Sequence, residues 1–438
     1  MRIMIAGGGT GGHVYPGIAM YDALRRRMGD VEVLFVGARA GVERRIFDDL
    51  GLPNVLLPGR GVRGKGLGTK LISPLILLAG VARGIREILA FKPDVVIGTG
   101  GYASVAVVAA SILCNRKRVL QEQNSVPGLA NRMLSRFADL VLLSYEESRA
   151  FLGRRVPAAV VGNPIRVKQP PDRGAALDFF DFEPDVPVVL ICGGSRGARS
   201  INEAAVDAIK GLIERRDLQF VFLTGDLDYE TVRSQLGLAG REERGERKGE
   251  RPDAHGEKEP RADLARRVGI EKRVRIYPFL QEMNHAYSAA DVAVSRAGAS
   301  AVFELAAFGV PTVFVPYPYA ADDHQRKNVS ALGAAGAAVV VEDRSFTGGQ
   351  LETIIETLLD DEERRGTMRR KTRTWARADA DSLAAEKILE LVPEHRMCSV
   401  GNAAADTCGV APTVDAEGAL ATSSCAAVAG HCGPGSRR

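Results

Sequence analysis

The first chemically informative residues form the segment GGGTGGH, residues 7–13, directly after the apolar run 3–6. Five glycines in six positions leave the backbone bare, so a ligand can approach its amides closely. A glycine-rich turn that opens a helix binds phosphate, because unpaired amides and the helix dipole both attract an anion. His13 follows at once, and an imidazole exchanges protons near neutral pH. The segment therefore predicts a diphosphate-binding loop beside a candidate general base.

Two other interpretations of this loop stay open. The loop fits the G-x-G-x-x-G pattern of dinucleotide-binding proteins, which needs an acidic residue after the second strand. The second apolar run, 31–36, is instead followed by Gly37, Ala38 and Arg39. Arg39 could meet a 2′-phosphate, which keeps an NADP-dependent oxidoreductase as an alternative. Close packing of a tight turn would explain one or two of the glycines. A P-loop is excluded, because no Gly-Lys-Ser/Thr follows.

Similar turns recur along the chain. GTGGY at 98–102, GGSRGA at 193–198 and SRAGAS at 295–300 each follow an apolar run, and the last opens a helix that carries Glu304. Loops at the carboxyl ends of parallel strands share one edge of a sheet, where open α/β sheets bind ligands. We therefore expect two phosphate-bearing ligands, one in each half of the chain.

The elements that position these turns are continuous apolar runs alternating with helical patterns. Such runs are typical of strands buried on both faces of a parallel sheet. The pattern predicts two successive α/β units, residues 1–163 and 164–396, with a final helix over about 383–391 packing back on the first. The predicted strands are 3–6, 31–36, 95–97, 118–121 and 140–143 in the first unit, and 188–192, 219–224, 274–277, 292–295, 311–315 and 337–341 in the second.

The bulk composition is that of a soluble globular protein. The 438 residues are 45% hydrophobic and 26% charged, and the net charge of +4 does not demand nucleic acid. No secretory signal or apolar stretch of membrane-spanning length is present, which predicts a cytoplasmic protein. The insertion 241–261 interleaves acids and bases, and residues 397–438 are rich in small residues, so we expect a mobile loop and a disordered tail. The tail's four cysteines show no zinc-ligand spacing.

Seven motifs stand in an order that resembles the MurG family of bacterial glycosyltransferases. They are GGGTGGHVYPG, GTGGY, QEQN at 121–124, VGNPIR at 161–166, GGSRGA, SRAGASAVFE and DHQRKN at 323–328. The resemblance covers about residues 1–395. Gln121 stands where the family commonly has His, a change that we expect to affect packing more than chemistry.

The resemblance implies the GT-B fold, in which two Rossmann-like domains with parallel sheets face a cleft. It implies inverting transfer of GlcNAc from UDP-GlcNAc to the C4 hydroxyl of the MurNAc of undecaprenyl-diphospho-MurNAc-pentapeptide (lipid I). The product, lipid II, serves peptidoglycan synthesis and so cell shape and division. Asp322 and Asp323 are adjacent and form no Asp-x-Asp signature, so we expect catalysis without metal or other cofactor. A non-catalytic nucleotide-sugar binder is a further alternative.

The resemblance also implies roles for individual residues. His13 is the candidate base, with Asn124 and Glu122 as lesser candidates. The alternative role for His13 is to hydrogen-bond the acceptor or to cap the loop. Glu304 would accept hydrogen bonds from the ribose, Leu280 would frame the uracil and Gln325 would bind the sugar hydroxyls. The acceptor diphosphate would lie on Gly8, Gly9, Gly100, Gly101 and Tyr102. The donor site would comprise Thr10, Gly11, Gly12, Asn124, Arg166, Ser195, Leu280, Ala299, Ser300, Ala301, Val302, Phe303, Glu304 and Gln325.

A basic and apolar segment suggests how a lipid acceptor is reached. The run LISPLILL at 71–78 is flanked by cations and fits either a core helix or a membrane face. The second interpretation predicts peripheral attachment to the anionic inner face of the plasma membrane, where division proteins are possible partners. The flanking cations are Arg60, Arg63, Lys65, Lys70, Arg83 and Arg86.

Overall fold

The computed structural model describes residues 1–39, 41, 43–58, 67–165, 170–194, 197–238 and 269–392, with only the main chain of 67–73. These residues belong to one compact unit. Several sequence predictions lie outside the described residues and are not tested by the structure. They are the insertion 241–261, the tail 397–438, Arg166, Ser195, Arg60, Arg63, Lys65 and the side chain of Lys70.

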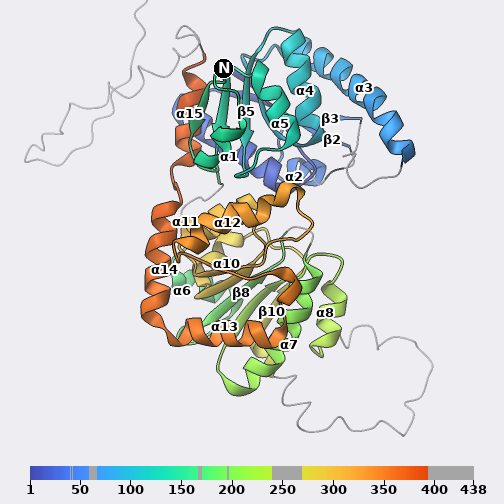
Figure 1. Cartoon of the computed structure of the whole chain (residues 1–438). Coiled ribbons are helices and arrows are strands. Elements are labelled where there is room, and N and C mark those ends of the chain that lie inside the picture. Colours follow the sequence, from blue (N-terminus) through green and yellow to red (C-terminus); the bar gives the residue numbers. More distant parts are fainter. Residues whose placement is uncertain are drawn as a thin grey trace, which may run out of the picture. The chain divides into compact units, whose positions relative to one another are not determined.

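Two parallel sheets organise the described chain (Figure 1). The first has seven strands in the order β3-β2-β1-β4-β5-β6-β7, and the second has six in the order β10-β9-β8-β11-β12-β13. The first sheet contains β1 (Arg2–Gly7), β2 (Glu32–Ala38), β3 (Asn54–Leu57), β4 (Val95–Gly100), β5 (Lys117–Glu122), β6 (Leu140–Leu143) and β7 (Ala158–Val160). The second contains β8 (Val188–Cys192), β9 (Gln219–Leu223), β10 (Val274–Tyr277), β11 (Val292–Ser295), β12 (Thr312–Phe314) and β13 (Val339–Val340).

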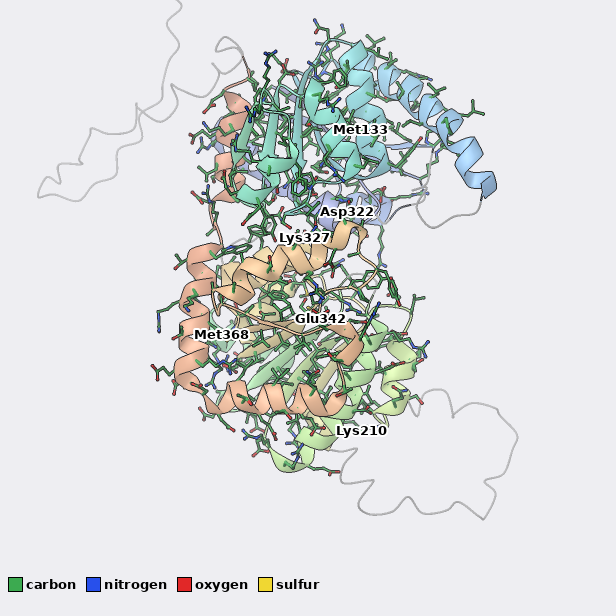
Figure 2. The ribbon with its side chains drawn as sticks, in the orientation of Figure 1. Met133, Lys210, Asp322, Lys327, Glu342 and Met368 are labelled. Carbon is green, nitrogen blue, oxygen red and sulfur yellow. The ribbon has the colours of Figure 1, made fainter. Side chains whose placement is uncertain are left out.

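Helices cover both faces of each sheet, as the continuous apolar strands predict. Around the first sheet lie α1 (Gly11–Met28), α2 (Glu43–Asp49), α3 (Leu67–Phe91), α4 (Gly101–Leu113), α5 (Leu129–Leu134), η1 (Ser135–Phe137) and η2 (Glu146–Phe151). Around the second lie α6 (Arg173–Phe180), α7 (Arg199–Arg215), α8 (Tyr229–Gln235), α10 (Met283–Ala289), α11 (Ala299–Phe308), η4 (Ala321–Asp323), α12 (His324–Ala334), η5 (Asp343–Ser345), α13 (Gly348–Asp360) and α14 (Glu362–Trp375). Met368 of α14, labelled in Figure 2, is buried in the core of the second sheet.

The eleven strands expected from apolar runs are all present, but β3 and β7 were not predicted. Both are edge strands of the first sheet and are short, and most of their residues are only half-buried. An edge strand buries less apolar surface, so its sequence carries a weaker apolar run.

Each sheet has one point at which the strand order reverses. In the first sheet the chain winds outward in opposite directions from β1 and β4, and in the second from β8 and β11. The loops that follow such a pair of strands separate toward opposite faces, which leaves room for a ligand at the carboxyl edge. The four glycine-rich turns of the sequence are the loops that follow these four strands.

The last helix, α15 (Ala380–Leu389), returns to the first sheet and lies next to α1 (Figure 1). Ala384, Ala385 and Ile388 join the core formed by β1 and α1, and Arg26 pairs with Asp381. Within the described residues, no helix is long and apolar enough to cross a membrane.

We predict that Ile388→Ala lowers the free energy of unfolding by ~2–5 kcal/mol, because truncating a buried isoleucine leaves a cavity. Ile388 is fully buried between α15 and the first sheet. Urea denaturation measures the change, and Lys387→Ala is the control, because this neighbouring side chain is only half-buried and pairs with Glu390 at the surface. Equal stability of both variants would show that α15 contributes no packing energy.

Candidate active site

The two glycine turns of the first sheet interlock with each other. The amide of Gly8 donates to the carbonyl oxygen of Gly100 at 3.2 Å. A Cβ on Gly101 would overlap the carbonyl oxygen of Gly8, and one on Gly7 would overlap the hydroxyl of Thr99. Close packing within the protein therefore requires Gly7 of the loop and Gly101 of the neighbouring turn, so the packing interpretation accounts for part of the loop.

The remaining part of the loop is open. Gly9 has a φ of +92°, and a Cβ built on it would meet nothing within 4 Å. Thr10 is the N-cap of α1 and makes no side-chain capping bond. The amides of the first turn of a helix have no acceptor within that helix, so those at Gly11 and Gly12 are open to an anion.

His13 is held by the same interlocked turns. Its Nδ1 lies 2.9 Å from the carbonyl oxygen of Gly8. Because a carbonyl only accepts, Nδ1 carries the proton in this contact, and the neutral ring keeps its lone pair on Nε2. A Cβ on Gly100 would lie 3.1 Å from Nε2, so the absence of a side chain there gives the ring its place. The geometry orients one nitrogen of His13 to accept a proton.

The N-terminus of α11 provides the second set of open amides. Its N-cap is Gly298, where an added Cβ would meet nothing within 4 Å, and Val302 begins the helical bonding to Gly298. The amides of Ala299, Ser300 and Ala301 therefore have no acceptor within α11. The hydroxyl of Ser300 is buried without a partner. A Cβ on Gly12 would lie 3.5 Å from this hydroxyl, which brings the starts of α1 and α11 together.

Glu304 lies one turn inside α11 and faces a buried tyrosine. The hydroxyl of Tyr287 donates to Oε2 of Glu304 at 2.7 Å. Burial raises the pKa of Glu304 to about 7, although the bond from Tyr287 acts in the opposite direction. The pKa of Tyr287 lies well above its usual value, first because of burial and then because of the charge of Glu304. Oε1 of Glu304 accepts no hydrogen bond from the described residues.

Asn124 belongs to a network around Glu122. Both the main-chain amide and the side chain of Asn124 donate to Oε1 of Glu122, and Asn131 donates to Oε2 at 2.8 Å. With both oxygens engaged, Glu122 acts as a structural acceptor more readily than as a base. Asn328 of α12 donates to Oδ1 of Asn124 and accepts from Ser125, which connects the two α/β units.

The other predicted site residues occupy varied settings. Gln325 accepts from the amide of Tyr317 at 2.9 Å. Tyr102 donates to the carbonyl oxygen of Ile76 in α3, and burial raises the pKa of Tyr102. The buried side chains of Leu280 and Val302 share a core cluster. Phe303 packs on Trp375, the only tryptophan of the chain, with ring centroids 4.7 Å apart.

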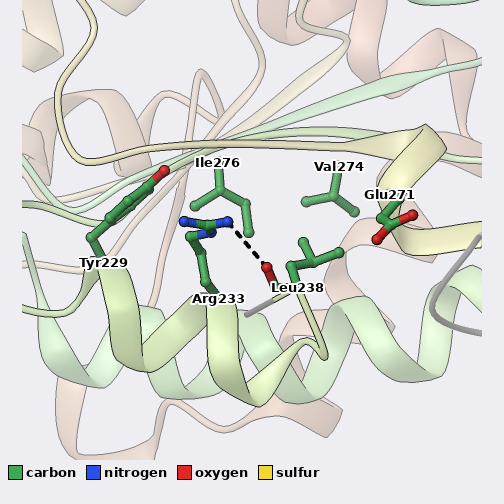
Figure 3. A pocket seen from close by; sticks show the side chains of 6 residues that line it. All are labelled: Tyr229, Arg233, Leu238, Glu271, Val274 and Ile276. Carbon is green, nitrogen blue, oxygen red and sulfur yellow. Dashed lines mark hydrogen bonds between the residues drawn. The ribbon is translucent and has the colours of Figure 1, made fainter. Parts of the chain in front are cut away.

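One surface hollow lies away from this constellation. Its volume is about 330 Å³, and none of the predicted site residues lines it (Figure 3). Open helix termini do not form an enclosed cavity, so we assign the site to the residues above. No group of three or more His, Cys, Asp or Glu within the described ranges is arranged to hold a metal ion. The lining residues of the hollow are Tyr229, Arg233, Leu238, Glu271, Val274 and Ile276.

Both halves of the chain match domains of one enzyme family. Residues 3–143 match the N-terminal domain of glycosyltransferase family 28, and residues 188–386 match its C-terminal domain. The chain belongs to glycosyltransferase family 28. The first match covers β1 to β6 and the second covers β8 to β13, and together they include both pairs of glycine turns.

Curated relatives of this family 28 chain agree in name. Proteins of Chlorobaculum tepidum and Lactiplantibacillus plantarum are each 37% identical, over 89% and 87% of this chain and 99% and 96% of their own lengths. Both are named UDP-N-acetylglucosamine--N-acetylmuramyl-(pentapeptide) pyrophosphoryl-undecaprenol N-acetylglucosamine transferase. The predicted glycosyltransferase activity is confirmed, and the oxidoreductase and the non-catalytic binder are set aside.

Solved structures agree in fold. The crystal structure of MurG from Acinetobacter baumannii is 27% identical, with a TM-score of 0.63 over 89% of this chain and 99% of that one. A UDP-GlcNAc 2-epimerase from Neisseria meningitidis bound to UDP-GlcNAc is 13% identical, with a TM-score of 0.61 over 89% of this chain and 100% of its own. The second likeness concerns the fold alone. The predicted GT-B fold of this family 28 enzyme is confirmed.

Two residues near the glycine loop and α11 escaped the sequence analysis of this family 28 enzyme. Glu43 is buried beneath Gly8 and Gly9, and Tyr287 holds Glu304. The sequence does carry a signal for Glu43, since this acid follows Gly37 and Gly41 at the end of the second strand. No local sequence pattern pairs Tyr287 with Glu304, because Tyr287 lies on α10 and β11 separates that helix from α11.

We predict that the free energy of unfolding of Glu304→Gln increases relative to that of the wild type as the pH rises from 5 to 8. The raised pKa of about 7, against an unfolded value near 4.5, means that folded Glu304 binds more protons between these values. The wild type therefore loses stability as pH rises through that window. Urea denaturation at each pH measures the difference, and the exposed Glu183→Gln is the control. A difference independent of pH would contradict the assignment.

Proposed function

We propose that this enzyme transfers GlcNAc from UDP-GlcNAc to the C4 hydroxyl of MurNAc in lipid I, with inversion at the anomeric carbon. The product is lipid II, and the pathway is peptidoglycan synthesis. The observation that carries the proposal is the approach of the starts of α1 and α11 next to His13. Each start lies at the reversal point of its own sheet, where a diphosphate ligand fits.

The donor diphosphate is proposed to lie on the open amides of Ala299, Ser300 and Ala301. As the bond to GlcNAc breaks, negative charge builds on UDP, and fixed amides stabilise it without reorganisation. Glu304 accepts from the ribose hydroxyls through its free oxygen. We therefore propose chemistry without a metal ion, which unchanged turnover in excess EDTA would support.

The acceptor side supplies the base. The C4 hydroxyl donates its proton to Nε2 of His13, while its oxygen attacks the anomeric carbon and UDP departs with the bonding electrons. The contact between Nδ1 and Gly8 supports this direction of proton transfer, because it leaves the lone pair on Nε2. The acceptor diphosphate is proposed to lie on the bare segment of the loop at Gly9. This proposal also gives it the amides of Gly11 and Gly12, which the family resemblance assigned to the donor site.

The decisive experiment is a transfer assay with labelled UDP-GlcNAc and a soluble lipid I analogue. We expect label in the disaccharide product and quenching of Trp375 by UDP-GlcNAc, since Phe303 of α11 packs on that ring. NADPH is the comparison ligand and should leave the fluorescence unchanged. Binding of UDP-GlcNAc without product would reject the proposal.

We predict that His13→Ala and His13→Asn both lower kcat by at least ~10²-fold, the usual contribution of a general base. Asparagine still reaches the carbonyl oxygen of Gly8 as a donor but has no basic nitrogen. If His13 only holds the loop, His13→Asn should stay within a few-fold of the wild type. The folded state of each variant is checked by circular dichroism.

We also propose that the enzyme attaches peripherally to the anionic inner leaflet through the face of α3. Leu75 and Leu78 of α3 are 66% and 64% exposed, and Arg83 follows on the surface.

We predict that replacing both Leu75 and Leu78 by Glu weakens binding to phosphatidylglycerol vesicles by ~10-fold or more, because apolar insertion is lost and charge repels the surface. Leu227→Glu, at an even more exposed leucine of the second unit, is the control. Equal vesicle binding of both variants would refute the proposal.

A further inference from the structure

Glu43 is a buried carboxylate that joins two loops at the carboxyl edge of the first sheet. It begins α2, directly after the loop that follows β2, and its side chain is fully buried. Oε1 accepts from the amide of Ala38 at 2.8 Å, and Oε2 accepts from the amide of Gly9 at 3.1 Å. The carboxylate therefore ties the end of β2 to the glycine loop after β1.

Three glycines make the space that this side chain fills. A Cβ on Gly8 or Gly41 would overlap the carboxyl group, and one on Gly37 would lie 2.5 Å from Cγ of Glu43. Gly37 and Gly41 have ordinary backbone conformations, so space, rather than backbone strain, requires them. The side chain of Glu43 thus explains why these three positions are glycine.

The chemistry of the contacts requires an acceptor at both oxygens. Ala38 and Gly9 each present an N–H group, and only a carboxylate offers two acceptors with no donor. Among the described residues, no ion pair is formed by Glu43. Burying a carboxylate without a cation is costly unless its hydrogen bonds are satisfied, and here main-chain amides satisfy them.

Gly9 is the residue through which Glu43 reaches the ligand site. It has a φ of +92° and directly precedes Thr10, the N-cap of α1. The preceding residue, Gly8, is held by Gly100 through its amide and by His13 through its carbonyl oxygen. Anchoring Gly9 thus completes the restraint of the loop and fixes the direction of the open amides at Gly11 and Gly12.

We propose that Glu43 is a positioning residue for the acceptor diphosphate: by accepting from Gly9 and Ala38, it preorganises the amides at the start of α1. This inference rests on the proposed function for the identity of the ligand. Glu43 does not touch the acceptor itself, since it lies buried beneath the loop. Its effect is on acceptor binding and orientation, because a loop that is already ordered loses less entropy when the ligand binds.

The principal variant is Glu43→Gln. It replaces one of the two acceptor oxygens by an NH₂ donor, which then faces a main-chain N–H group. We expect the KM for a soluble lipid I analogue to rise by ~10-fold or more, the range of one lost charge-assisted hydrogen bond. UDP affinity, measured by Trp375 fluorescence, should stay within ~2-fold, because the nucleotide binds in the other unit. Partial unfolding would lower the active fraction and hence kcat but leave KM unchanged, so the KM separates positioning from stability.

A second variant displaces the carboxylate without removing its charge. Gly41→Ala places a methyl group where the carboxyl group lies and should also raise the acceptor KM. Gly349→Ala, where a Cβ meets nothing within 4 Å, is the matched control. Asp139→Asn is the control for the change of acid to amide, because Asp139 accepts from the amide of Arg118 elsewhere on the same sheet. Both controls should keep the wild-type KM.

Hydrogen–deuterium exchange over residues 7–13 tests the inference independently of activity. The single acceptor oxygen of Glu43→Gln cannot serve both Gly9 and Ala38, so the tie between the two loops is lost and the segment should exchange faster than in the wild type. Unchanged exchange, or faster exchange with an unchanged acceptor KM in both variants, would overturn the positioning role. If the wild type itself transferred no GlcNAc, the proposed function would fail, whereas the exchange result would still decide whether Glu43 orders the loop.

Discussion

The structure depends on main-chain amides that have no partner within their own helices. An α-helix leaves its first amides unpaired, and a parallel α/β sheet points these helix starts toward the carboxyl edge of its strands. Here α1 and α11 both start at the point where strand order reverses, and Gly12 and Ser300 approach each other. The proposed pair of diphosphates, one on the donor and one on the acceptor, matches these two sets of open amides. The chemistry of the family thus follows from a property of the backbone.

The side chains of the site serve to orient this backbone and the reacting groups. Gly8 donates its amide to Gly100 and accepts from His13 at its carbonyl oxygen, and Glu43 fills the space that a side chain on Gly8 would need. The bond to Gly8 in turn sets the tautomer of His13 that leaves Nε2 basic. On the proposed donor side Tyr287 donates to one oxygen of Glu304, and the other oxygen has no partner among the described residues. Each proposed catalytic or binding group is thus held by a neighbour whose own place is fixed by packing.

Glycines in this protein serve two purposes, to leave space for a ligand and to leave space for another part of the protein, and only the structure distinguishes the two. Gly9 and Gly298 face open space, as expected for close approach of a ligand. Gly37, Gly41 and Gly101 are bare because another part of the protein fills the space of a side chain. A run of glycines records that something passes close to the backbone, but it does not record whether that neighbour is a ligand, a carboxylate or a second loop.

The sequence by itself determined the strands of both sheets except the edges β3 and β7, because continuous apolar runs mark strands buried on both faces. It also located the glycine turns and His13, since these signals are local in the chain. Tertiary structure alone decided which nitrogen of His13 is basic and why Gly41 is bare, and it revealed Tyr287 beside Glu304. These facts depend on contacts between residues distant in sequence, and no local pattern of residue types encodes the geometry of such contacts.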